Sequence, residues 1–457
     1  MPRSFVSRRP AMLVVLGAIA LASTSTAQAA GKATTSTASH PAVVDSKPWT
    51  GDFDGMLQRR RVRMLVPYSR TLFYVEKGQR HGLSADLARD FETYLNKRYA
   101  KQLAGGHFTV SLIPTTRDKL LSGLTDGLGD ISGGNLTETA ARAQIADFVV
   151  PTQRAPATEV LVSGLNAPPV LASPEGLSGR KVNVRQSSSY LESLNALNEK
   201  LSAASRPGVQ IITMPDALED EDLLEMMNAG LFDYTVVDSW KAKLWAQTTP
   251  QIHVHEDIVL RSGGTIGWAI RKQSPKLQAA IEGFYQSASQ QGLMEARLAA
   301  YQQRLKELSS SSAASLKHFD ETIALFRKYG SKYAFDPLMM AAEGQTQPAS
   351  DEELEGAVKA ATKHNDELMT QEFPDAKFSE LDRTLFTFAS YKAGADKIAA
   401  MRKEAAKRGL DPNLWFNNVE QVTAEKLGMA TTAYVRNIYK YDTAYKLIAQ
   451  SQNTAQK

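Results

Sequence analysis

Residues 333–350 (YAFDPLMMAAEGQTQPAS) carry the pattern that decides the fold of the second half of the chain. Asp336 followed by Pro337 predicts a helix start, because the carboxylate can accept from free backbone N–H groups and proline fits the first turn. Pro348 predicts the end of this helix. Four residues recur between them at helical spacing and predict one buried face: Leu338, Ala341, Ala342 and Gln345.

This stretch resembles the catalytic helix of the lytic transglycosylases, lysozyme-like enzymes that cleave peptidoglycan, and in particular the murein transglycosylase F subfamily. In that subfamily the helix has the pattern D-x-L-L-L-A-A-Q-G-Y-Q-E-S, and its catalytic Glu aligns with Gln347 of this chain. Residues 382–394 (DRTLFTFASYKAG), 403–418 and 433–447 resemble later helices of the same module. The resemblance implies an all-α, lysozyme-like domain over residues 317–457, with Tyr391 and Tyr434 in a glycan cleft.

The chemistry of this family requires a carboxyl group that gives a proton to the glycosidic oxygen and then takes one back. The amide of Gln347 cannot titrate near neutral pH, Lys392 replaces an Asn of the family, and a cleft-lining G-x-x-Q-x-M-P segment is absent. The sequence therefore predicts a module that has lost catalysis. Glu343 lies one helical turn before Gln347 and is the substitute candidate, but a carboxylate satisfied by its helix neighbours is the favoured interpretation.

The first half of the chain alternates short apolar runs with helical patterns, which predicts an α/β domain over residues 49–305. The expected strands are residues 63–68, 108–113, 181–184, 210–214, 232–237 and 265–271, with helices over 83–100 and from 117. Several segments resemble the amino-acid-type periplasmic solute-binding proteins: 129–148 (G-D-x…R…D-F), 185–190, 230–238 and 267–272. The resemblance implies a two-lobed fold with its ligand between the lobes.

The predicted binding site would hold a free amino acid, which carries a carboxylate and an ammonium group. Arg142 would bind the carboxylate, helped by the helix start near Ser188, and Asp238 would neutralise the ammonium. Arg142 could instead form a structural ion pair with Asp147 or a neighbour, and Asp238 could cap the next helix. The remaining predicted contacts are polar groups of the first lobe and two aromatic rings: Asn135, Thr137, Phe73 and Tyr74.

The ends and joints of the chain have their own compositions. Residues 1–30 combine early arginines, a short apolar run and an A-x-A site, which predicts a secretory signal peptide, with an uncleaved anchor as the alternative. Residues 31–48 are rich in Ser, Thr and Ala and are expected to be a disordered spacer, and the serine run within 306–316 predicts a linker. The mature protein is expected in the periplasm, with contact to the cell wall or outer membrane.

The composition limits the remaining function classes. A net charge of +4 over 457 residues gives no case for nucleic acid but suits an acidic polymer such as the cell wall. The absence of cysteine excludes thiol catalysis and cysteine-ligated metal. His253 and His255 share a strand face, but no third ligand is evident, so a surface strand is expected and no metal or other cofactor.

The preferred hypothesis is an exported solute-binding protein for an amino acid, a small peptide or a cell-wall fragment, fused to an inactive transglycosylase-like module. That module could still bind peptidoglycan or a protein partner. The first alternative is an active lytic transglycosylase that releases 1,6-anhydromuramoyl products. The second is the substrate-binding component of an amino-acid ABC transporter.

Overall fold

The computed structural model describes residues 47–76, 79–151, 156–168, 172–305 and 369–455. The predicted signal peptide, most of the spacer and the linker lie outside these ranges. So do the predicted catalytic helix and its two candidate positions, Glu343 and Gln347.

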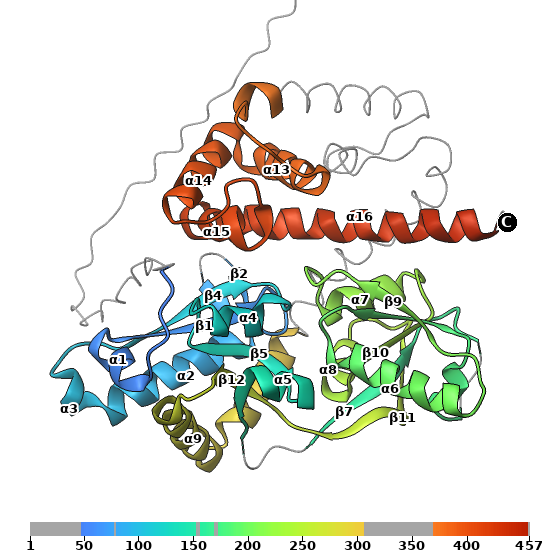
Figure 1. Cartoon of the computed structure of the whole chain (residues 1–457), viewed down its shortest axis with the longest axis horizontal. Coiled ribbons are helices and arrows are strands. Elements are labelled where there is room, and N and C mark those ends of the chain that lie inside the picture. Colours follow the sequence, from blue (N-terminus) through green and yellow to red (C-terminus); the bar gives the residue numbers. More distant parts are fainter. Residues whose placement is uncertain (1–46, 77–78, 152–155, 169–171, 306–368, 456–457) are drawn as a thin grey trace, which may run out of the picture. The chain divides into compact units, whose positions relative to one another are not determined.

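The first lobe is built on a five-stranded sheet of order β4-β1-β5-β12-β6 (Figure 1). Its elements in chain order are α1 (Phe53–Gln58), β1 (Arg61–Pro67), β2 (Tyr74–Glu76), β3 (Gln79–His81), α2 (Leu83–Arg98), α3 (Ala100–Leu103), β4 (Thr109–Thr115), α4 (Lys119–Thr125), β5 (Ile131–Thr137), α5 (Ala140–Ile145), β6 (Ala146–Val149), β12 (Ile266–Arg271) and α9 (Pro275–Gln290). β1 pairs in parallel with both β4 and β5, and β12 returns antiparallel to β5.

Strand β1 shows why this lobe forms two apolar layers. Alternate side chains of a strand point to opposite faces of the sheet. Met64 packs in a core with Phe91 of α2, whereas its neighbour Leu65 packs with Leu120 of α4. A parallel strand covered by helices on both faces is expected to be apolar on both sides, and residues 64–67 (MLVP) of β1 form such a run after Arg63.

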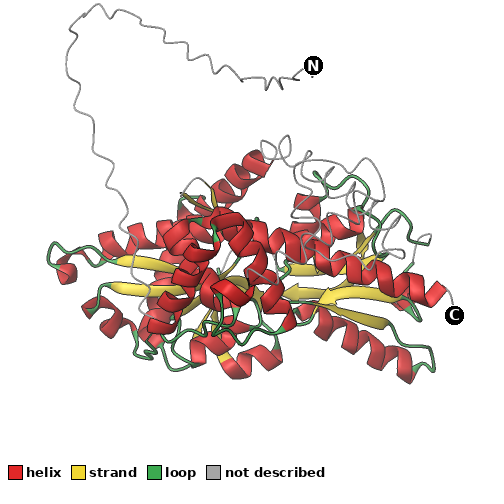
Figure 2. Cartoon of the chain, turned by 90° about the horizontal axis from the view of Figure 1, so that it is seen from above, coloured by secondary structure: helices red, strands yellow, loops and turns green. Residues whose placement is uncertain are grey.

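The second lobe has its own five-stranded sheet, of order β11-β7-β10-β8-β9. Its elements are β7 (Ala157–Ser163), the short 3-10 helix η1 (Pro174–Leu177), β8 (Lys181–Arg185), α6 (Ser189–Ala203), β9 (Gln210–Met214), α7 (Asp220–Asn228), β10 (Tyr234–Asp238), α8 (Ser239–Trp245) and β11 (His253–Gly264). Leu161 of β7 packs toward Leu194 of α6, and Val160 packs toward Trp245 of α8. Figure 2 shows the helices lying around the strands of both sheets.

The chain crosses between the lobes twice, from β6 to β7 and from β11 to β12. Because each lobe has its own sheet and the chain passes between the lobes twice, this part of the chain has the two-lobed α/β fold that the sequence predicts. A helix, residues 293–305, follows α9.

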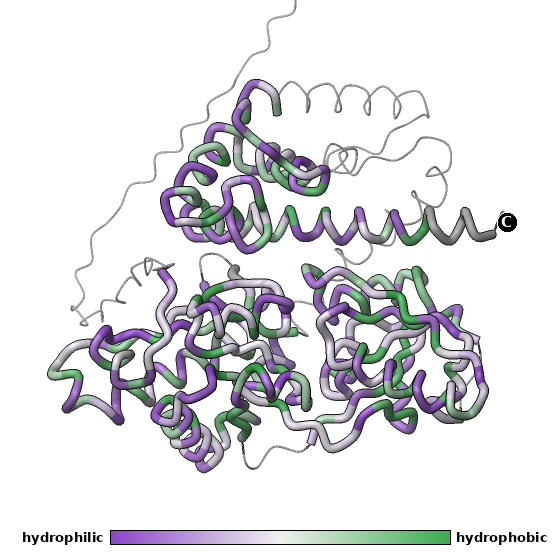
Figure 3. Tube along the Cα trace, viewed as in Figure 1, coloured by the Kyte–Doolittle hydropathy of each residue, from purple (hydrophilic) through white to green (hydrophobic). Residues whose placement is uncertain are grey.

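The described part of the C-terminal region is helical, as predicted: α13 (Glu380–Ala393), α14 (Ala395–Lys407), the π-turn η2 (Trp415–Val419), α15 (Glu420–Leu427) and α16 (Met429–Ala455). Gly394 adopts φ +97° and lets the chain turn from α13 into α14. Phe386, Ile398 and Trp415 pack in one core. Hydrophobic and hydrophilic residues alternate along α16 (Figure 3), which is typical of a helix with one buried face.

Candidate functional site

A small cavity of about 20 Å³ lies between the two lobes. Five of the seven predicted ligand-binding residues line it: Asn135, Thr137, Arg142, Ser188 and Asp238. The first three belong to lobe 1 and the last two to lobe 2, as expected for a ligand that bridges the lobes. A cavity of this size holds about one water molecule.

Arg142 on α5 crosses from one lobe toward the other. Its Nη1 donates to the Thr137 carbonyl oxygen and its Nη2 to the Ser187 carbonyl oxygen, both at 2.8 Å. The predicted alternative was a structural ion pair with Asp147 or a neighbour. Asp147 pairs instead with Lys272, but Arg142 does form an ion pair with Glu192, at 3.6 Å. Burial lowers the pKa of Arg142, and Glu192 only partly offsets this. The guanidinium is therefore a buried cation whose ion pair with the partly exposed Glu192 is long, at 3.6 Å.

Ser188 is the N-cap of α6, and its hydroxyl oxygen accepts from Leu191 N at 3.3 Å. The same hydroxyl donates to the Arg185 carbonyl oxygen at 2.7 Å. The start of a helix presents free backbone N–H groups and a partial positive charge. This end of the cavity therefore suits an anionic group, as predicted.

Asp238 ends β10 with only 2% of its surface exposed. Asp238 occupies the N-cap position of α8, but its side chain makes no capping hydrogen bond, and its Oδ1 has no hydrogen-bond partner in the described structure. Burial raises the pKa of Asp238 to about 6, against the lowering effect of Lys241 and with a further increase from Asp220. A buried carboxylate without a partner is energetically costly and is suited to receive a cation.

Asp238 is expected to make stability depend on pH. Its raised pKa means that the folded protein holds the proton more tightly than the unfolded chain. Its stabilising effect is therefore complete below about pH 4 and is lost as the pH rises through 6. Because two pKa units correspond to about 3 kcal/mol, Asp238→Asn should be more stable than the wild type by about that amount at pH 8.

Urea unfolding of both proteins between pH 4 and pH 8 tests this expectation. The difference in unfolding free energy should shrink toward acid pH. A difference that is constant across this range would contradict the assignment of the titration to Asp238.

The sequence did not predict a buried charge network beside Asp238. Asp220 at the start of α7 accepts from Arg185 Nη2 at 2.7 Å, from Tyr190 Oη at 3.1 Å, and from Lys241 Nζ. The segment 219–222 (EDED) was the available signal, since four successive carboxylates exceed what one helix start needs. Arg185, Tyr190 and Lys241 line the small cavity, so the network forms one of its walls.

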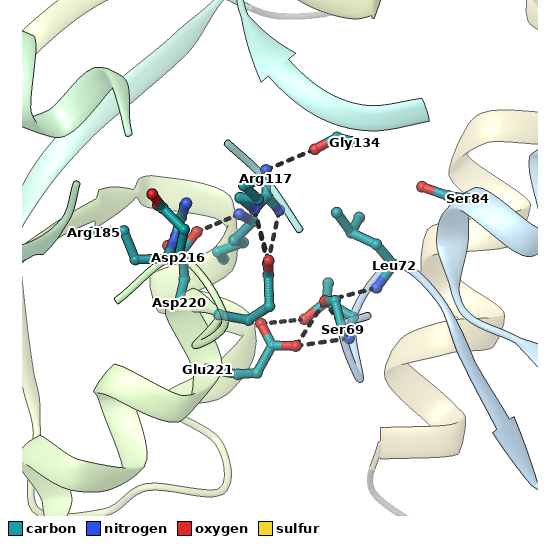
Figure 4. Close-up of polar contacts among 12 residues, drawn as sticks. Ser69, Leu72, Ser84, Arg117, Gly134, Arg185, Asp216, Asp220 and Glu221 are labelled. Carbon is teal, nitrogen blue, oxygen red and sulfur yellow. Dashed lines mark hydrogen bonds and ion pairs between the residues drawn. The ribbon is translucent and has the colours of Figure 1, made fainter. Parts of the chain in front are cut away.

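The two acidic residues on either side of Asp220 make hydrogen bonds to lobe 1: Glu219, the N-cap residue of α7, and Glu221 of α7. Glu219 accepts from Arg117 Nε at 2.9 Å, while Arg117 Nη1 donates to the Gly134 carbonyl oxygen at 2.9 Å. Glu221 Oε1 accepts from Ser69 Oγ at 2.7 Å and from Thr71 N at 3.2 Å. Figure 4 shows Glu221 pointing toward the loop that carries Ser69 and Leu72.

The two predicted aromatic contacts lie elsewhere, and this part of the prediction is corrected. Phe73 is 3% exposed and packs in the core of lobe 1, where its ring centroid lies 5.9 Å from that of Tyr68. The Tyr74 hydroxyl accepts from Arg304 Nε at 2.7 Å. Neither residue lines the interlobe cavity. Phe73 lies in the loop before β2 and Tyr74 is the first residue of β2, and Phe73 N donates to the Ser69 carbonyl oxygen at 2.8 Å.

A larger cavity of about 360 Å³ lies beside the interlobe crossings. Apolar side chains make up much of its wall, among them Leu83, Leu87, Ile266 and Leu298. Asn135 lines both cavities. The two cavities are therefore neighbours that differ in polarity.

The remaining candidates of the sequence are distributed as follows. His253 and His255 make an edge-to-face contact, with 4.5 Å between ring centroids. They lie on β11, an edge strand in which His253 is exposed, while His255 is buried beside the Ser163 hydroxyl. In the described ranges no group of three potential ligands could hold a metal ion.

The two tyrosines predicted for a glycan cleft lie in the C-terminal region. Tyr391 is 58% exposed, and Lys392 Nζ lies 5.4 Å from the ring centroid of Tyr434.

Several relatives match most of the chain. Membrane-bound lytic murein transglycosylase F of Desulfosudis oleivorans is 24% identical over 86% of this chain and 91% of its own length. The protein of the same name from Ectopseudomonas mendocina is 25% identical over 80% of this chain and 82% of its own length. The chain is thus similar to transglycosylase F proteins across both of its halves. No helix in the described part of the chain has the length and apolar character of a membrane span.

Solved structures of amino-acid-binding proteins match about half of this chain. One is the amino acid ABC transporter substrate-binding protein AbpA from Streptococcus pneumoniae bound to L-arginine, 17% identical, with a TM-score of 0.46 over 55% of this chain and 98% of that protein. Residues 62–304, more than half of the chain, match the family model of the bacterial extracellular solute-binding proteins, family 3. This match contains both sheets, both crossings and every residue of the interlobe cavity. The chain therefore belongs to the bacterial extracellular solute-binding proteins, family 3.

Proposed function

We propose that the two lobes bind a small molecule that carries both a carboxylate and an ammonium group, such as an amino acid or a small peptide. The observation that carries this proposal is the Oδ1 atom of Asp238, which is buried and has no hydrogen-bond partner in the described structure. Asp238 shares a cavity with Arg142 and with the N-terminus of α6. An ammonium group would satisfy the carboxylate, while a carboxylate would satisfy Arg142 and the helix start.

Ligand binding should depend strongly on Arg142. Removal of one partner of a buried, hydrogen-bonded charge pair costs about 2–5 kcal/mol. Arg142→Ala should therefore weaken binding at least about thirtyfold. Isothermal titration calorimetry with free amino acids and with muropeptides checks this, and Arg89→Ala, which removes an exposed arginine of lobe 1, is the control.

Two outcomes would contradict the proposal. One is the absence of heat with every amino acid and muropeptide tested on the wild-type protein. The other is unchanged affinity in Arg142→Ala, which would show that the ligand binds outside the interlobe cavity.

The C-terminal module is proposed to have lost glycan cleavage while keeping the transglycosylase scaffold. Its support is the sequence, in which Gln347 stands where the related enzymes carry their general acid. Loss of a general acid costs about a hundredfold to ten-thousandfold in rate. The module would then bind peptidoglycan or a protein partner, and the protein would act in the periplasm.

An active transglycosylase is the second candidate function, because the relatives that match most of the chain bear that name. Purified peptidoglycan sacculi distinguish the two candidates. We expect no release of 1,6-anhydromuropeptides by the wild-type protein and a gain of release in Gln347→Glu. Release by the wild type that disappears in Glu343→Ala would establish the active enzyme instead.

A further inference from the structure

We propose that the interlobe cleft is held closed by side chains of the chain itself, so that the closed state is the resting state and a ligand must first displace this latch. The latch is formed by Glu219 and Glu221 of lobe 2 with Arg117 and the loop 69–72 of lobe 1. The inference goes beyond the proposed function, since it holds whatever the ligand is.

The polar contacts of the latch are close and buried. Arg117 Nη2 lies 2.8 Å from Glu219 Oε2, and the side chains are 5% and 4% exposed. Thr71 Oγ1 donates to Glu221 Oε2 at 3.3 Å and accepts from Trp245 Nε1 at 2.9 Å. Each of these bonds joins one lobe to the other. Opening the cleft would break all of them together.

An apolar contact strengthens the same connection. Leu72 is fully buried, and it packs in a cluster with Leu224 and Trp245 of lobe 2 rather than in the core of its own lobe. The Leu72 side chain therefore contacts the second lobe, while its backbone carbonyl oxygen accepts from Ser84 N of the first lobe at 2.9 Å. Separation of the lobes would expose this side chain to water, which opposes opening in addition to the lost hydrogen bonds.

The binding site itself is filled in this closed state. Two N–H groups of Arg142 donate to carbonyl oxygens, one to Thr137 of lobe 1 and one to Ser187 of lobe 2. The cavity of about 20 Å³ admits about one water molecule and excludes an amino acid. The ligand can enter only the open state. Its apparent association constant is therefore the intrinsic constant multiplied by the fraction of molecules that are open, so a small open fraction weakens binding.

The distance between the lobes tests this inference directly. The chain has no cysteine, so Lys101→Cys in lobe 1 and Glu199→Cys in lobe 2, both at exposed positions, give two unique labelling sites. Single-molecule energy transfer on the ligand-free, full-length protein should show one short-distance population. Two latch variants, Arg117→Ala/Leu72→Ser in lobe 1 and Glu219→Gln/Glu221→Gln in lobe 2, should each shift the closed-to-open ratio about tenfold or more toward open.

Asp147→Asn is the matched control, because it removes an acid whose partner Lys272 lies in the same lobe, and the short distance should persist. Agreement between variants made from opposite lobes separates opening from local misfolding, and circular dichroism checks that each variant is folded. A long distance in the ligand-free wild type would overturn the inference, and so would folded latch variants as compact as the wild type. Neither result depends on ligand binding, so failure of the proposed function is a separate outcome.

Discussion

Asp220→Ala is expected to destabilise the second lobe by about 3–5 kcal/mol, because it leaves two buried cations without their counter-charge. The carboxylate accepts from Arg185 Nε at 2.9 Å and from Arg185 Nη2 at 2.7 Å, and it also accepts from Lys241. Lys241 is 1% exposed and Arg185 is 3% exposed, so water cannot replace Asp220 without local unfolding.

The effect of Asp220→Ala should depend on pH in the opposite sense to that of Asp238. Burial alone would raise the pKa of Asp220, but Arg185 and Lys241 outweigh it and hold the pKa far below its usual range. Its contribution to stability is therefore present above about pH 4 and is lost as the pH falls further.

Urea unfolding gives the loss of free energy, and hydrogen exchange of the β8 and β10 amides assigns that loss to lobe 2. The control is Asp54→Ala, whose pairing with Lys276 is 61% exposed on both sides and should contribute less than about 1 kcal/mol. A change in Asp220→Ala as small as in this control would contradict the predicted role of the network.

Asp130→Ala should destabilise the first lobe by a similar amount, about 3–5 kcal/mol. Asp130 is fully buried and accepts from Arg63 Nη2 at 2.9 Å, from Arg63 N at 2.8 Å, and from Arg59. Arg271 of β12 lies 3.4 Å from the same carboxylate. One carboxylate therefore balances three arginines from three elements of the lobe.

The loss of stability in Asp130→Ala should be confined to lobe 1. Arg63 and Arg271 also donate to the Trp49 and Gly51 carbonyl oxygens, so Asp130→Ala should loosen the segment that precedes α1. Urea unfolding measures the loss, and increased hydrogen exchange in β1 and α1 locates it. Asp147→Ala, whose pairing with Lys272 is partly exposed, is the control with an expected effect below about 1 kcal/mol.

Local sequence patterns predicted most of the architecture of the lobes. The apolar run 63–68 and the run 232–237 correspond to β1 and β10. Buried strands and amphipathic helices have patterns that depend on neighbours a few residues apart, which is why a single sequence contains them. Arg142, Ser188 and Asp238 line one cavity, and the sequence could group them because each stands at a strand end or near a helix start within a stretch that resembles the family.

The residues that escaped prediction take their roles from partners distant in sequence. Glu219 meets Arg117 across 102 positions, and Glu221 meets Ser69 across 152. An acidic helix start is a common local feature, so the segment 219–222 gives no sign of which carboxylate crosses the cleft. Phe73 was misplaced for a related reason, since an aromatic residue in a loop can fill a core as well as cover a ligand.

The sequence by itself determined that the chain has two α/β lobes with a helical region after them, and it predicts, from the resemblance alone, that Gln347 takes the place of a catalytic acid. Periodicity and short motifs carry this information, because secondary structure and covalent order are local. Only the tertiary structure decided that Asp238 is a carboxylate without a hydrogen-bond partner and that Asp220 is held by Arg185 and Lys241. Burial and pairing of charges depend on which distant side chains fold against them, and no local pattern records that choice.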